Sequence, residues 1–120
     1  MDRISYPQRG EVYFLPFAES TGSEMKDKHP ALVVQNDKAN RFSGLIIIVP
    51  ITGTLKVADL PVGVKIIPPE GGMIKPSVIH CGHIYTVNKS EFSPERFAGR
   101  VSPETMLKVN NALKISLELV

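Results

Sequence analysis

Short runs of apolar residues, each bounded by glycine, proline or small polar residues, constrain the fold of this chain more than any other feature of its sequence. They occupy residues 10–17, 30–35, 44–52, 61–68 and 76–87, and several are rich in β-branched or aromatic residues. Runs of this length and composition are typical of β-strands. The last run contains Gly82, and a glycine inside a strand often marks a bulge. This run is therefore one strand, or two pieces broken at Gly82.

The C-terminal part of the chain changes to a helical period. Ser102 followed by Pro103 is typical of an N-cap with proline at the first helical position, and Glu104 suits the positive start of a helix. An apolar stripe at spacings of three and four predicts that this helix packs on the sheet. The stripe consists of Met106, Val109, Leu113, Leu117 and Val120.

Five to seven strands before one late helix predict a mainly β (α+β) fold, a small antiparallel barrel with a C-terminal helix packed on it. The composition is that of a single ordinary domain over residues 1–120, with 42% hydrophobic and 22% charged residues. The net charge of +2 permits a phosphate-bearing partner without requiring one.

Several other features limit where and how the protein works. The longest apolar stretch, GLIIIVPI, is far shorter than the roughly 18 residues of a membrane span, so we expect a cytoplasmic protein with no membrane association. The single cysteine, Cys81, lies in an apolar segment and is expected to be a buried small residue without a catalytic role. The three histidines show no recognised metal-ligand spacing and no glycine-rich phosphate loop is present, so we expect neither a metal nor a cofactor.

What remains is a set of acid, base and donor groups on a long polar loop, residues 18–29, and near strand ends. One side of a small barrel, where strands end, commonly forms a groove for single-stranded nucleic acid or peptide. Taken singly, each of these residues is also typical of an ordinary hydrogen-bonded polar group. The set comprises Glu24, His29, Thr52, His80, His83 and Tyr85.

A series of motifs runs along the chain from about Arg9 to Leu119: RGEVYF, GSE, a basic residue plus proline five residues on, PALVVQND, NRFSGLIIIVPIT, KPSVI, RVSPETM and KVNNALKISLEL. In this order they resemble the MazF/PemK family of toxin endoribonucleases. The resemblance implies an SH3-like barrel, a homodimer, and a cognate antitoxin that covers the active groove. It also implies metal-independent cleavage of single-stranded RNA by the ribose 2′-hydroxyl, giving 2′,3′-cyclic phosphate and 5′-hydroxyl ends.

The resemblance assigns roles to matching positions. His29 occupies the position of the family's catalytic arginine, and Thr52 matches the threonine whose hydroxyl donates to the scissile phosphate. Glu24 and Ser23 match loop positions that shape the RNA groove. We count Glu24 as catalytic, and Ser23 and Lys28 as RNA-binding. Histidine in place of arginine changes the chemistry, because imidazole presents single donors but can also accept a proton.

Three further positions depart from the family pattern. Where relatives typically carry an acidic residue, then glutamine, and arginine two positions later, this chain has Gly82, His83 and Tyr85, and His80 aligns with a catalytic arginine of one branch. We expect His83 to be catalytic and His80 and Tyr85 to bind RNA. Plain strand alternation puts His80 and His83 on opposite faces unless the chain bulges at Gly82.

Two accounts of these departures remain open. In one, the site is rebuilt around imidazole groups and the protein cleaves RNA. In the other, the fold persists as an antitoxin-binding or nucleic-acid-binding dimer that leaves RNA intact. A third possibility, a toxin that acts on a protein target, rests only on a sister family with the same barrel, and fold alone does not decide function.

Overall fold

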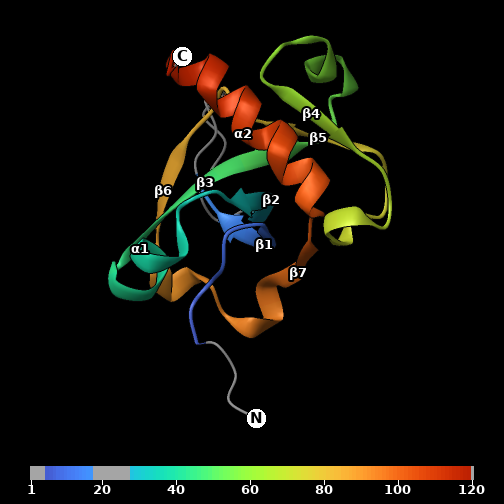
Figure 1. Ribbon diagram of the computed structural model, residues 1–120. Coiled ribbons are helices and arrows are strands. Elements are labelled where there is room, and N and C mark those ends of the chain that lie inside the picture. Colours follow the sequence, from blue (N-terminus) through green and yellow to red (C-terminus); the bar gives the residue numbers. More distant parts are fainter. Residues whose placement is uncertain (1–4, 18–27, 120) are drawn as a thin grey trace.

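The computed structural model describes residues 5–17 and 28–119, which form a curled antiparallel sheet with one long helix lying across it (Figure 1). Within these residues the strands pair in the order β4-β5-β3-β2-β1-β7, and β6 also pairs with β3. This arrangement confirms the predicted mainly β fold with a C-terminal helix packed on it, and the predicted antiparallel barrel takes the form of a half-barrel. The strands are β1 (Glu11–Pro16), β2 (Lys28–Val33), β3 (Leu45–Thr52), β4 (Gly63–Ile66), β5 (Ser77–His80), β6 (Tyr85–Asn88) and β7 (Phe97–Arg100).

Strand β3 is the central strand of the sheet, because it pairs with β2 on one side and with both β5 and β6 on the other. Ile51 of β3 lies opposite Ile79, and Ile48 lies opposite Tyr85. The step from Ile48 to Ile51 is three residues, whereas the step between their partners, Ile79 and Tyr85, is six. Three extra residues therefore bulge out between β5 and β6. Of the two alternatives for residues 76–87, the structure selects two pieces broken around Gly82.

The two faces of the sheet each carry an apolar cluster. Val12, Leu32 and Val49 belong to one cluster, together with residues of α2 (Pro103–Leu117). We call this side the helix face. Tyr13 and Ala31, the immediate neighbours of Val12 and Leu32, belong to the second cluster, on what we call the far face. Side chains on a strand alternate between faces, so this division assigns the remaining strand residues to one face or the other.

Helix α2 begins as predicted, with the Ser102 hydroxyl accepting a hydrogen bond from the Thr105 N–H at 3.1 Å. The predicted stripe is partly wrong. Met106, Val109 and Leu113 pack into the helix-face cluster, but Leu117 is 51% exposed, and Val120 lies outside the described residues. The buried helix positions are Thr105, Val109 and Ala112. Continuing their spacing of four and three reaches Ser116 rather than Leu117.

A short helix, α1 (Asp37–Phe42), was not predicted from the sequence. Its first turn is capped by Asn36, whose side chain accepts a hydrogen bond from the Ala39 N–H at 2.8 Å. The fully buried Asn40 amide donates to the Gln35 carbonyl and to Asp37. The helix is too short for an apolar period to reveal it, although the Asn36 cap was a local signal. No helix in the described part of the chain has both the length and the hydropathy needed to span a membrane.

A half-buried carboxylate connects the β4–β5 turn to the start of α2. Glu70 accepts hydrogen bonds from the Thr105 hydroxyl and from the N–H and hydroxyl of Ser102. Burial, the largest single influence, raises the pKa of Glu70, but these bonds and the charge of Lys108 together hold it below its ordinary value of 4.5. The carboxylate is thus more stable ionised in the folded protein than in the unfolded chain.

Glu70→Gln is expected to lower the free energy of unfolding near pH 7 by about 1 kcal/mol, a modest value because the carboxylate is partly exposed. A lowered folded-state pKa gives stability that is present above the unfolded value and lost as the pH falls through the folded value. The variant should therefore lose less stability than the wild type on acidification below about pH 5. Urea titrations over this range test the expectation, with Glu104→Gln in the first turn of α2 as control. Parallel pH curves for Glu70→Gln and the wild type would contradict it.

Candidate active site

Strand alternation places four of the predicted site residues on the far face. His29 shares its face with Ala31, and Tyr85 shares its face with Val87, both of which belong to the far-face cluster. Thr52 is four positions after Ile48 on β3, so it shares the far face with Ile48. Thr52 lies opposite Val78, and His80, two positions after Val78 on β5, therefore points to the same face. His29, Thr52, His80 and Tyr85 therefore point away from the face that α2 covers.

His29 was predicted to lie on the polar loop, but it is the second residue of β2, opposite Leu15 of β1. Its ring lies 5.5 Å from that of Phe17, and Phe17 in turn lies 5.0 Å from Tyr85. Three rings thus form a row across the ends of β1, β2 and β6. Phe17, only 3% exposed, was missed by sequence reasoning, although an aromatic residue at the end of a strand is a recognisable signal.

Thr52, the last residue of β3, lies at the same end of the β2–β3 pair as His29. The last paired residues there are Ala31 and Pro50; His29 lies two residues before Ala31, and Thr52 lies two residues after Pro50. The Thr52 hydroxyl oxygen accepts a hydrogen bond from the Thr54 N–H at 3.1 Å. A hydroxyl group that accepts in this way keeps its own proton for donation.

His80 and His83 are brought together by the bulge between β5 and β6. Their rings are stacked, with centroids 3.9 Å apart and planes inclined by 16°. The Gly82 N–H donates to Nδ1 of His80 at 3.1 Å, so the neutral His80 ring carries its hydrogen on Nε2. Burial, the largest influence, and the neighbouring His83 lower the pKa of His80 below 6.5, against a smaller opposing effect of its own backbone carbonyl. His80 is thus suited to donate from Nε2 as a neutral group.

The remaining residues singled out from the sequence are Lys28, Ser23, Glu24 and Cys81. Lys28 is exposed, and strand alternation puts its side chain on the helix face with that of Leu32. Its contact with RNA stays a prediction. Ser23 and Glu24 lie outside the described residues. Cys81 is buried as predicted, and burial raises the pKa of its thiol to about 11. In the described part of the chain, no three histidine, cysteine or acidic side chains converge as metal ligands.

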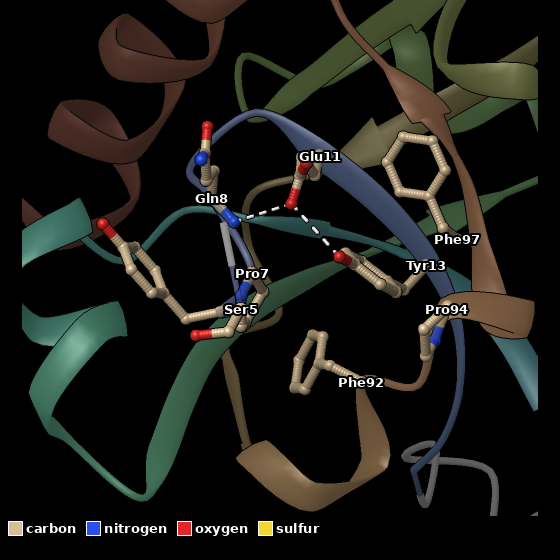
Figure 2. Close-up of a pocket in the computed structure, with 9 residues that line it drawn as sticks. Ser5, Pro7, Gln8, Glu11, Tyr13, Phe92, Pro94 and Phe97 are labelled. Carbon is tan, nitrogen blue, oxygen red and sulfur yellow. Dashed lines mark hydrogen bonds between the residues drawn. The ribbon is translucent and has the colours of Figure 1, made fainter. Parts of the chain in front are cut away.

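A pocket of about 460 Å³ lies at the other end of β1 (Figure 2). Its walls include Tyr13, whose ring meets those of Phe92 and Phe97 edge to face, but none of the predicted site residues. The Glu11 carboxylate in this pocket accepts hydrogen bonds from the Gln8 N–H, the Tyr13 hydroxyl and Arg100. Tyr13 lies in β1 and Phe17 directly follows the end of β1, so the two are four residues apart along the chain, or about 13 Å. None of the predicted acid, base or hydroxyl groups lines this pocket, so the candidate site is the far-face set of His29, Thr52, His80 and Tyr85, with His83 stacked on His80.

The fold and the cluster together define a small half-barrel protein with candidate acid, base and hydroxyl groups on the sheet face opposite its C-terminal helix. Comparison with known proteins identifies its relatives. Residues 8–117 match the family described as PemK-like, MazF-like toxins of type II toxin-antitoxin systems. The chain belongs to this family.

Individual relatives agree with this assignment. The chain is 38% identical to Endoribonuclease EndoA of Bacillus subtilis over 113 residues, 94% of this chain and 96% of that protein. It is 34% identical to Endoribonuclease MazF of Staphylococcus saprophyticus, over 93% of this chain and 92% of the relative. A mycobacterial endoribonuclease solved in complex with its cognate antitoxin has a TM-score of 0.75 and 28% identity, covering 95% of this chain and 97% of that one.

Proposed function

We propose that this toxin is a metal-independent endoribonuclease that cleaves single-stranded RNA. The observation that carries the proposal is the placement of His29, Thr52 and His80 on one sheet face, with His83 stacked on His80. These are the group types that transesterification of RNA requires. Relatives named as endoribonucleases, 38% and 34% identical over nearly the whole chain, support the same activity.

The chemistry follows from the substrate. The ribose 2′-oxygen attacks the adjacent phosphorus, a bond from phosphorus to the 2′-oxygen forms, and the bond to the 5′-oxygen breaks. A base takes the 2′-hydroxyl proton, an acid protonates the departing 5′-oxygen, and donors stabilise the phosphorane. Because the nucleophile belongs to the RNA, no metal-bound water is needed. The products are a 2′,3′-cyclic phosphate and a 5′-hydroxyl.

The residues divide these roles according to their hydrogen-bonding state. Thr52 donates a hydrogen bond from its hydroxyl to a phosphate oxygen, and His80 donates one from Nε2. His80 is a poor base in this arrangement, because its Nδ1 already accepts the Gly82 N–H. Proton transfer then falls to His29 and His83. Glu24, Ser23 and Lys28 complete the proposal as catalytic, groove-shaping and RNA-binding residues, and Tyr85 lines the groove beside Phe17.

The proposal includes the biological setting of the enzyme. We infer that the whole chain, residues 1–120, forms one such domain, that it works as a cytoplasmic homodimer, and that a cognate antitoxin protein inhibits it. The antitoxin is inferred from the mycobacterial relative, which was solved in complex with one.

Incubation of the purified protein with a long unstructured RNA in EDTA tests the activity. We expect discrete cuts ending in 2′,3′-cyclic phosphate, with single-stranded DNA of the same sequence left intact, because deoxyribose lacks the nucleophile. Bound RNA that stays intact at high protein concentration would overturn the proposal. That result would favour the alternative, a non-catalytic dimer whose RNA affinity falls with salt.

A further inference from the structure

Gly82 has a structural role that its backbone does not explain. Its φ lies outside the left-handed region, since the positive-φ glycines among the described residues are Gly10, Gly71 and Gly72. The requirement for glycine comes instead from the neighbouring ring. A Cβ at position 82 would lie 2.8 Å from Cε1 and 3.2 Å from Nδ1 of His80. Any side chain here would therefore overlap the imidazole where it now lies.

The His80 ring is held in this space by contacts on two sides. The Gly82 N–H donates to its Nδ1 at 3.1 Å, and the His83 ring stacks on it with centroids 3.9 Å apart. Both contacts depend on the bulge that separates β5 from β6. Together they fix the tautomer and direct the hydrogen-bearing Nε2 away from the Gly82 amide, since the two nitrogens lie on different sides of the ring.

We propose that Gly82 is a positioning residue, whose missing side chain allows His80 to stack on His83 and to donate from Nε2 to a phosphate of bound RNA. The inference rests on the proposed function for its ligand, while the position of His80 stands on the contacts of this chain. A neutral donor at this place complements the Thr52 hydroxyl, which lies on the same face of the adjacent strand.

Gly82→Ala, with Gly44→Ala as the matched control, tests the proposal. A Cβ at Gly44 would have nothing within 4 Å, so this variant adds the same methyl group in open space. We expect Gly82→Ala to lower the rate of RNA cleavage roughly tenfold or more, as for loss of one donor to the reacting phosphate. Gly44→Ala should cleave RNA at the wild-type rate. Thermal melting checks the fold, because the new methyl group would also lie 3.2 Å from Val62.

Nuclear magnetic resonance reports the stacking of His80 on His83 directly, which a general loss of stability in Gly82→Ala would not imitate. In the wild type, ring currents from the stacked partner should shift the imidazole C–H resonances of His80 and His83 upfield. Gly82→Ala should abolish this shift and raise the pKa of His80 toward its ordinary value of 6.5, because burial and His83 now lower it. Wild-type spectra without stacking shifts would overturn the proposal without recourse to any variant.

The double variant Gly82→Ala/His80→Ala shows whether the methyl group at position 82 slows RNA cleavage by displacing His80 or in some other way. If Gly82 acts through His80, the glycine change should add no further loss in the His80→Ala background. An equal further loss in both backgrounds, or full activity of Gly82→Ala, would overturn the inference. Affinity for single-stranded DNA, which binds without being cleaved, supplies a second comparison. If the wild type bound but did not cleave RNA, the proposed function would fail, and weaker DNA binding by Gly82→Ala would still support the role of Gly82.

Discussion

His29→Ala should lower the rate of RNA cleavage by a factor of about 100 or more, the range for loss of a general acid or base. The imidazole lies at the end of β2 beside Phe17, on the same face and at the same strand ends as Thr52. Alanine keeps the backbone pairing of position 29 with Leu15 and removes only the ring. We therefore expect a stability loss of about 0.5–1.5 kcal/mol from the ring contact with Phe17, together with a contribution from the ring area that becomes exposed.

Initial rates and thermal melts of His29→Ala measure these two effects separately. His29→Arg is the informative companion, because guanidinium restores the permanent charge and paired donors that the resemblance places at this position. We expect His29→Arg to retain more activity than His29→Ala. Cleavage by His29→Ala at the wild-type rate would remove His29 from the active site.

Leu32→Ala should lower the free energy of unfolding by about 2–5 kcal/mol, the range for a large-to-small change at a fully buried position. Leu32 is 0% exposed and lies in the helix-face cluster with Val12 and Val49. The truncation leaves a cavity between the sheet and α2. A loss of this size is a large part of the 5–15 kcal/mol that typically stabilises a domain.

Urea denaturation of Leu32→Ala measures the effect, and Leu107→Ala serves as the control. Leu107 is 69% exposed on α2, so the same truncation there should change stability by less than about 0.5 kcal/mol. Similar losses in the two variants would mean that the helix-face cluster is not the core of the fold. RNA cleavage by Leu32→Ala should persist below its melting temperature, since Leu32 points away from the site.

Local sequence was sufficient for most of the secondary structure. The apolar runs predicted strands β1 to β6, and Ser102 with Pro103 predicted the start of α2, because strand period and helix capping depend on residues close together in the chain. Strand β7 lies in none of these runs and was not predicted. The short helix α1 and the exposure of Leu117 were not foreseen. The first has too few residues to show a period, and the second depends on how far the sheet reaches beneath α2.

Some features of the candidate site also follow from the sequence, and others only from the tertiary structure. The sequence by itself determined which residue types are available, that His29 stands where the resembled family has arginine, and that Gly82 could interrupt a strand. Only the tertiary structure decided that His29 belongs to β2, that Phe17 lies against it, and that His80 stacks on His83. The physical reason is strand register. The number of residues in the bulge follows from how β5 and β6 each pair with β3, a relation between segments about 30 to 40 residues apart.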